Sequence, residues 1–241
     1  EIKECDWSSD VCSSDLDDDL REATRSRLET EHALHRALEQ GEFTVEYQPI
    51  VDLASGDVEG LEALVRWRHP ERGIVPPSEF VPLAEETGVI AGIGTFVLEE
   101  ALGQVGAWMA DGTVGPEFSI SVNLSARQFE LQDIVATVRA ALEQSGVAPA
   151  QLCVEITEGT LMSAASVAAL ARLHDLGVRV AIDDFGAGYT SFRNLKHLNA
   201  DMVKLDGGFV KNLVNDASDR IFVKMMSELS SSFGMETVAE W

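Results

Sequence analysis

The sequence has no apolar run of the ~18 residues or more that a transmembrane helix needs. It is also short of basic residues, with Lys+Arg 18 against Asp+Glu 41 in 241 residues and a formal net charge of −23. This balance excludes a generic nucleic-acid surface and a surface for anionic membranes. Solubility explains most of the excess, but an acidic chain that acts on a phosphodiester would need bound cations. We therefore expect no nucleic-acid polymer as partner and no membrane segment.

Cysteines are few, and none has the spacing of a disulfide framework or a zinc site. Cys5, Cys12 and Cys153 form no Cys-x-x-Cys pair and lack clustered histidines. Cys153 lies in an apolar run, which indicates an inert buried thiol in a reducing compartment. We therefore expect a cytoplasmic protein. The Gly-rich phosphate-binding motifs of Rossmann and P-loop folds are absent as well, which disfavours those nucleotide-binding folds.

The first nineteen residues have no helical or strand periodicity. They hold eight acidic residues and one lysine, and residues 7–16 repeat Ser-Ser-Asp. Residues 1–19 resemble a translated sequencing adapter, and the alternative is a natural disordered acidic tail. Residues 20–40 show a helical pattern that ends at Gly41. We expect 20–40 to be a connector helix, or alternatively a simple cap on the fold, and 41–241 to be the main domain.

From residue 43 onward, apolar β-rich runs alternate with helical patterns. The strand-like runs cover 43–53, 59–67, 118–125, 152–158, 178–184, 202–207 and 235–240, and the helical patterns cover 78–88, 94–110, 126–145, 160–176, 190–198 and 217–233. This order predicts an α/β protein with a parallel sheet and right-handed crossovers. Its length favours a closed (β/α)8 barrel over an open doubly wound sheet. Because seven strands are visible, we expect the last strand and its flanking helices to be missing here, which would leave an open barrel edge.

Two adjacent aspartates, Asp183 and Asp184, follow the apolar run 178–182. Two carboxylates at the end of a buried strand are unfavourable unless a cation balances them. Side-by-side oxygen ligands suit Mg²⁺ or Mn²⁺. For an isolated pair, an Asp-rich turn after a strand would be the simpler interpretation.

The other strands overturn that simpler interpretation, because they also end in polar residues. The set is Glu62, Asn123, Glu155, Glu158, Asp183, Asp184, Lys204 and Glu240. In a barrel the carboxyl ends of the strands converge on the active site. The oxygen ligands among them could hold two cations about 3.5–4 Å apart, bridged by Asp183, which would activate water for attack on a phosphodiester.

Each predicted role follows from the chemistry of the side chain. Glu62, Asn123, Glu155 and Asp183 would surround one cation, and Asp184 would hold the second. Lys204 could orient the water or neutralise developing charge, and Glu240 could ligate the second cation or accept a proton. Arg66 shares strand parity with Glu62 and could grip a phosphate.

Several motifs resemble the signature of the EAL-domain family over about residues 36–241. They are Tyr47-Gln48-Pro49-Ile50, Glu62-Ala63-Leu64, Ser121-Val122-Asn123-Leu124-Ser125, Glu155-Ile156-Thr157-Glu158, Asp183-Asp184-Phe185-Gly186-Ala187-Gly188-Tyr189, Val203-Lys204-Leu205-Asp206 and Val238-Ala239-Glu240. The resemblance implies a modified TIM barrel that hydrolyses cyclic di-GMP to linear pGpG with Mg²⁺ or Mn²⁺. It assigns two metals per site to Glu62, Asn123, Glu155, Asp183 and Asp184, and it makes Lys204 and Glu240 catalytic.

The same resemblance implies further roles and partners. Glu158 matches the glutamate that anchors the loop after Asp184, a loop tied to activity and dimerisation, and Gln48, Leu64, Arg66 and Asp206 match substrate-lining positions. The expected partners are cyclic di-GMP, a second copy of the domain, and an upstream GGDEF or sensory domain in a larger signalling protein. Missing regions of that parent could anchor it to a membrane.

The sequence departs from the family pattern at a few places. Trp241 stands where glycine usually follows the last glutamate, a later glutamine is absent, and Gly207-Gly208 replaces a basic residue and serine. All metal ligands and the catalytic pair are retained. We therefore predict a phosphodiesterase, with a non-hydrolytic cyclic di-GMP receptor as the alternative.

Overall fold

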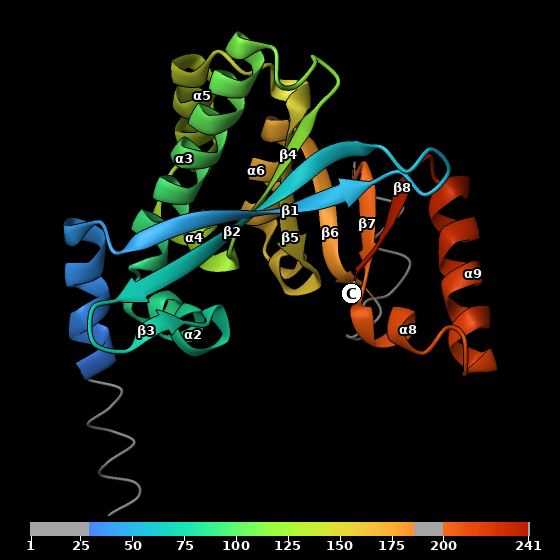
Figure 1. Ribbon diagram of the computed structural model, residues 1–241, viewed down its shortest axis with the longest axis horizontal. Coiled ribbons are helices and arrows are strands. Elements are labelled where there is room, and N and C mark those ends of the chain that lie inside the picture. The colour runs from blue at the N-terminus through green and yellow to red at the C-terminus, as the bar shows by residue number, and fades with distance from the viewer. Residues whose placement is uncertain (1–28, 186–199, 241) are drawn as a thin grey trace, which may run out of the picture.

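The computed structural model describes residues 29–185 and 200–240, which form a curved sheet flanked by helices (Figure 1). The strands are β1 (Phe43–Val51), β2 (Val58–His69), β3 (Gly73–Val75), β4 (Ser119–Asn123), β5 (Leu152–Thr157), β6 (Arg179–Phe185), β7 (Met202–Leu205) and β8 (Glu236–Ala239). The helices are α2 (Pro77–Thr87), α3 (Ile90–Asp111), α4 (Ala126–Leu131), α5 (Ile134–Ser145), α6 (Ala164–Asp175), α8 (Gly207–Lys211) and α9 (Ala217–Ser232), with short 3₁₀ turns at Pro149–Gln151 and Glu158–Met162. A further helix covers 29–40.

The sheet runs in the order β1-β2-β4-β5-β6-β7-β8, and β3 pairs with β2 off this path. From β2 through β8 the strands of this path are parallel, as the alternation of strands and helices predicts. At one edge the sheet departs from the parallel order that the alternation predicts, because β1 pairs antiparallel with β2. A short turn joins these two strands, and a parallel pair would need a crossover of a dozen residues or more.

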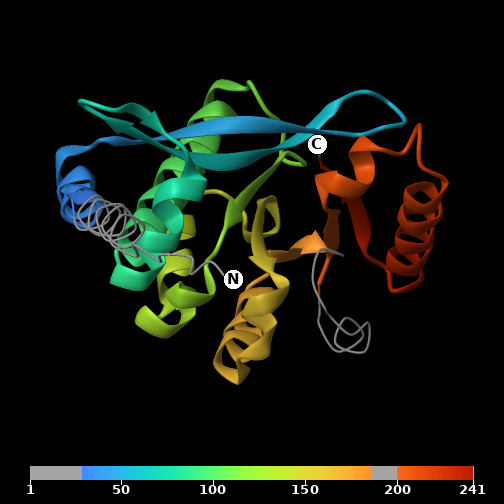
Figure 2. The ribbon, with the colours of Figure 1, turned by 90° about the horizontal axis from the view of Figure 1, so that it is seen from below.

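The curvature of the sheet gives a half-barrel with helices outside it (Figure 2). Helices α3, α5 and α6 lie along β4, β5 and β6, and α9 packs beside β7 and β8 at the far edge (Figures 1 and 2). The buried side chains of β4, β5 and β6 are almost all apolar below their carboxyl ends, which fits strands covered on both faces. The α/β class and the curved, mainly parallel sheet are therefore confirmed.

Some element boundaries differ from those that the sequence predicts. The pattern over 126–145 is two helices, because the Asp133 side chain accepts a hydrogen bond from the Ala136 N–H and starts α5 after an extended Gln132. The strand over 202–207 stops at Leu205, since Asp206 caps the short helix α8 in the same way. Strand β3 was missed because it has only three residues. The predicted helix over 190–198 and the tail over 1–19 lie outside the described residues.

The N-terminal half of the core is built around Trp67. Its indole is fully buried, lies against the rings of Phe43 and Phe80 at centroid distances of 6.0 and 5.8 Å, and donates a hydrogen bond of 2.9 Å to Glu42 Oε2. The helix over 29–40 presents its buried Ala33, Leu34 and Ala37 to the same core. Within the described ranges, no helix is both long and apolar enough to cross a membrane.

We expect Trp67→Ala to lower the free energy of unfolding by about 3–5 kcal/mol, because it removes the ring on which two aromatic side chains pack. Urea denaturation followed by circular dichroism would measure this loss. Trp67→Phe keeps most of the packing and loses the bond to Glu42, so it should cost only about 1–2 kcal/mol. Equal stability of Trp67→Ala and the wild type would show that this aromatic cluster contributes little.

Candidate active site

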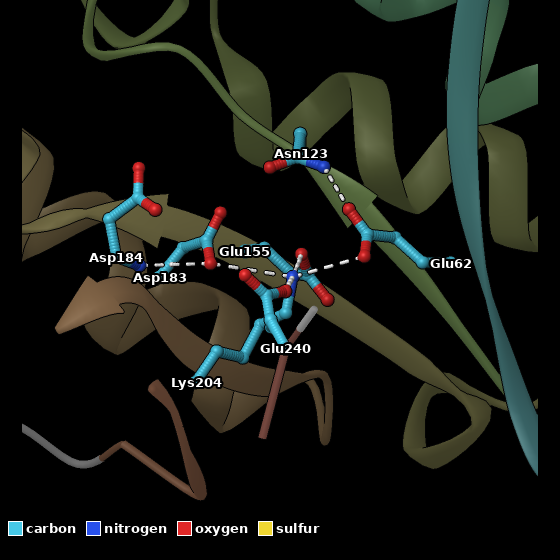
Figure 3. Close-up of polar contacts among 7 residues, drawn as sticks. All are labelled: Glu62, Asn123, Glu155, Asp183, Asp184, Lys204 and Glu240. Carbon is cyan, nitrogen blue, oxygen red and sulfur yellow. Dashed lines mark hydrogen bonds and ion pairs between the residues drawn. The ribbon is translucent and has the colours of Figure 1, made fainter. Parts of the chain in front are cut away.

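Lys204 lies at the centre of a group of carboxylates at the carboxyl ends of the parallel strands (Figure 3). Its Nζ is 3.1 Å from Glu62 Oε2, 3.4 Å from Asp183 Oδ1 and 2.5 Å from Glu240 Oε1. It also donates a hydrogen bond to Glu155 Oε2. The Lys204 side chain is only 2% exposed and that of Glu155 is fully buried. A single ammonium group therefore joins four carboxylates that come from β2, β5, β6 and the end of β8.

The strand register explains why these side chains meet. In the pairing of β4 with β5, Asn123 lies opposite Glu155, and in that of β7 with β8, Lys204 lies opposite Val238. The Glu240 N–H then bonds to the Leu205 carbonyl at 3.3 Å, which places its carboxylate beside Lys204. Because alternate residues of a strand share a face, residues at the last inward position of each strand point into one space.

Asn123 and Glu62 form the side of the site opposite the aspartates (Figure 3). The Asn123 amide Nδ2 donates a hydrogen bond of 2.8 Å to Glu62 Oε1. This bond fixes the rotation of the amide, so that its carbonyl oxygen remains to contact a cation. The Asn123 side chain is exposed, unlike the buried Glu155 that lies opposite it.

Asp183 and Asp184 stand at a distortion of β6. The pairing of β6 with β7 shifts register between Ile182 and Phe185, and Asp184 has a positive φ of 53°. Few residues other than glycine adopt this conformation, although Asp and Asn tolerate it best. The Asp184 N–H bonds to Asp183 Oδ1 at 2.9 Å. The distortion lets oxygens of both aspartates and of Glu240 lie within 4.8 Å of one another.

The site holds more negative charge than Lys204 can balance. If all five carboxylates were ionised, the one ammonium would leave four negative charges unbalanced. Burial raises the pKa of Glu155 to about 8; the attraction of Lys204 opposes this rise, and the smaller repulsion from Glu62 adds to it. Burial and the neighbouring Asp183 and Asp206 raise the pKa of Asp184, and burial also raises that of Glu240.

The pKa of Lys204 moves in the direction that keeps its charge. Burial alone would lower it, but the attraction of Glu155, Asp183 and Glu62 outweighs burial and raises it. The lysine therefore stays protonated at neutral pH. The unbalanced charge must be met from elsewhere, by protons or by bound cations.

The donor set fits divalent cations. The buried Glu155 Oε1 has no hydrogen-bond partner in the described part of the chain, although a buried carboxylate oxygen normally has one. The oxygens available are carboxylates and one amide, which are the hard ligands that Mg²⁺ and Mn²⁺ prefer. Two divalent cations would also cancel the four excess negative charges. The residues present therefore fit such ions at the predicted positions.

The predicted substrate-lining residues lie on the same face of β1 and β2 or beside the aspartates. Gln48 is directly opposite Glu62 in the register, so both side chains point to one face. Leu64 and Arg66 continue that face along β2. Arg66 Nε bonds to Glu46 Oε2 at 2.9 Å, and its Nη1 bonds to its neighbour's backbone carbonyl. Arg66 is thus held against Glu46 of the neighbouring strand β1.

Two further predicted residues take part in local structure. Asp206 Oδ1 accepts the Gly208 N–H at 2.8 Å and so caps α8, while its charge still acts on Asp184. Glu158 begins the 3₁₀ turn after β5, half-buried, and its charge also raises the pKa of Asp184. The loop that Glu158 is predicted to anchor, residues 186–199, lies outside the described residues.

Other residues near the site were missed from the sequence. Ser121 is 1% exposed on β4, two residues before Asn123 on the same face, and it lowers the pKa of Glu155. Glu46 pairs with Arg66 across β1 and β2. Glu85 of α2 accepts a hydrogen bond from Ser125. Strand parity could have indicated Ser121, but the Glu85 contact joins distant segments and leaves no local signal.

Comparison with known proteins bears on this geometry. The EAL domain profile matches residues 31–241. The bifunctional diguanylate cyclase/cyclic di-GMP phosphodiesterase MucR of Pseudomonas aeruginosa is 40% identical over 218 residues, 90% of this chain and 32% of that protein. The chain thus spans about a third of that curated relative.

Solved structures share the fold. One is a PaMucR phosphodiesterase in complex with c-di-GMP, with a TM-score of 0.82 and 40% identity over 88% of this chain and 85% of that chain. Another is the EAL enzyme Bd1971 bound to cAMP and cyclic-di-GMP, with a TM-score of 0.85 and 26% identity over 98% and 66% of the two chains. These likenesses confirm the predicted EAL-type, TIM-barrel-like architecture, and the chain belongs to the EAL domain family.

Proposed function

We propose that this chain is a divalent-metal-dependent phosphodiesterase that hydrolyses cyclic di-GMP to linear pGpG. The observation behind the proposal is the set of five carboxylates and Asn123 around one buried lysine, which is more acidic groups than one ammonium can balance. Membership of the EAL domain family and the likeness to a phosphodiesterase in complex with c-di-GMP support this substrate.

In this proposal the side chains divide into those that hold cations and those that handle water and substrate. Glu62, Asn123, Glu155, Asp183 and Asp184 would hold two ions, Mg²⁺ or Mn²⁺. When bound, such ions polarise a phosphodiester and lower the pKa of an attacking water. Two ions would make the site nearly neutral, whereas one would leave about two negative charges to repel an anionic substrate.

The remaining groups act on the proton and the phosphate. Lys204 Nζ, already a donor to several oxygens, would orient the attacking water and offset charge on the phosphate. Glu240, at 2.5 Å from that Nζ, would accept the proton of the water. The water oxygen then bonds to phosphorus as one P–O ester bond breaks, and the leaving ribose oxygen takes the proton that Glu240 has accepted. Arg66 and Gln48 would bind the substrate phosphates or bases at the rim, together with Leu64 and Asp206.

The competing function is a cyclic di-GMP receptor that binds without hydrolysis. The two functions differ in what the site requires, because a receptor has no need of the full ligand set or of the Lys204–Glu240 pair. Both groups are present and in contact, which favours the enzyme. The relative MucR is named as bifunctional, which supports an upstream cyclase or sensory domain in a longer protein of this type. We also propose that the domain pairs with a second copy and works in the cytoplasm.

Hydrolysis of cyclic di-GMP tests the function directly. With Mn²⁺ or Mg²⁺ we expect the wild type to form pGpG, as followed by chromatography, and excess EDTA to abolish the product. Asp183→Asn should lower the rate at least ~10³-fold, because it removes a charge from both proposed cation positions. Circular dichroism should show that this variant is folded. Binding of cyclic di-GMP by the wild type without any pGpG would instead establish the receptor.

The buried lysine allows a second test that needs no substrate. We expect Lys204→Met to lower the free energy of unfolding in EDTA by about 3–5 kcal/mol, because it leaves buried carboxylates without their counter-charge. Added Mn²⁺ should recover part of the lost melting temperature, since the ions supply positive charge to the same oxygens. Lys211→Met, which removes an exposed lysine of α8, is the control. Identical melting of Lys204→Met with and without Mn²⁺ would contradict the proposed metal site.

A further inference from the structure

The turn that follows β4 is fixed by three hydrogen bonds at Ser125. Its N–H donates to Gln128 Oε1 at 2.9 Å, and its Oγ accepts the Arg127 N–H at 3.2 Å, which together cap α4. The Ser125 hydroxyl proton then goes to Glu85 Oε1 at 2.5 Å. A bond this short is typical of a hydroxyl that donates to an ionised carboxylate. Every polar group of Ser125 that faces the turn is thus engaged.

Glu85 comes from a separate, well-anchored element. It lies on α2, whose Phe80 and Ala84 are fully buried, and Phe80 packs on Trp67 of β2. The carboxylate therefore reaches Ser125 from a helix attached to the strand that also bears Glu62. This arrangement ties the end of β4 to the β2 side of the site.

The predicted metal ligand nearest to this turn in the sequence is Asn123, two positions before Ser125. Its side chain is exposed and is not held by packing, and Figure 3 shows its amide reaching toward Glu62. Between them, the Leu124 N–H bonds to the Glu155 carbonyl at 2.8 Å. The direction of the Asn123 amide is therefore set by its backbone on one side and by its hydrogen bond to Glu62 on the other.

We propose that Glu85 is a positioning residue for the metal site, which acts through Ser125 to aim the Asn123 carbonyl oxygen at the bound ion. The inference rests on the proposed function in taking Asn123 as a ligand. Outer groups that orient metal ligands commonly change metal affinity by about 10–100-fold when they are removed. Glu85 contacts no predicted ligand itself, so its effect must pass through the β4–α4 turn.

Mn²⁺ binding, followed by electron paramagnetic resonance of the free ion, tests the proposal on the full chain. Glu85→Ala should raise the dissociation constant of one of the two ions by about 10-fold or more. Ser125→Ala should have a similar effect, and the double variant should add little, because both changes break one link. Glu85→Gln keeps an oxygen acceptor and should stay within about 3-fold of the wild type. Glu99→Ala, which removes an exposed carboxylate from α3, should change nothing.

A second measurement needs neither metal nor turnover. In the metal-free protein, the side-chain amide protons of Asn123 should give NMR signals shifted by the bond to Glu62. Glu85→Ala and Ser125→Ala should move these signals toward those of a free amide, and Glu85→Gln should restore them. If Glu85→Ala lowers only the melting temperature, with unchanged Mn²⁺ affinity and unchanged Asn123 signals, Glu85 is merely structural and the proposal fails.

The outcomes also separate this proposal from the proposed function. If Glu85→Ala moves the Asn123 signals but the wild type forms no pGpG, the phosphodiesterase is refuted and the positioning role is supported. If the wild type and Glu85→Ala form pGpG at the same rate and reach half of that rate at the same Mn²⁺ concentration, the positioning role is refuted. The proposed phosphodiesterase activity is then still supported.

Discussion

The contact of Lys204 with four carboxylates is the constraint on which the rest of the structure depends. Burying one ammonium and one carboxylate is costly unless each finds its partner, and here the partners come from four different strands. The register of the parallel strands must therefore be correct from β2 to β8 before all of these contacts can form together. A slip of one residue in any strand would turn its charged side chain to the opposite face.

The layer of charged residues around Lys204 lies directly above a layer of apolar residues on the same strands. Cys153, Ala181 and Met202 are buried two residues before Glu155, Asp183 and Lys204, and they form a small apolar layer under the charges. Burial and the nearby Glu155 raise the pKa of Cys153 to about 12, as expected for a thiol in that layer. Most of the buried apolar side chains belong to a separate cluster that includes Trp67 and residues of α2, α3 and α5.

The sequence predicted most of the strands and the group of polar residues at their ends, because both follow from short-range patterns. Glu62, Asn123, Glu155, Asp183 and Lys204 each interrupt an apolar run, and parallel strands bring such interruptions together. The antiparallel pairing of β1 with β2 was not predicted. The prediction followed the alternation of strands and helices in the rest of the chain, and the short turn between β1 and β2 breaks that alternation. The contacts of Glu46 with Arg66 and of Glu85 with Ser125 could not be predicted, since they join residues 20 and 40 positions apart.

Charge balance links the lysine to the proposed cations. Lys204 contacts one oxygen of each of four carboxylates, and within the described residues the buried Glu155 Oε1 is left without a hydrogen-bond partner. Because the raised pKa keeps Lys204 charged, ions that enter must share these carboxylates with it instead of replacing it. The ammonium then stays beside the ions, where a water and a phosphate would both lie within its reach. An arrangement that only bound the dinucleotide would not require this sharing, which is why the position of Lys204 favours hydrolysis.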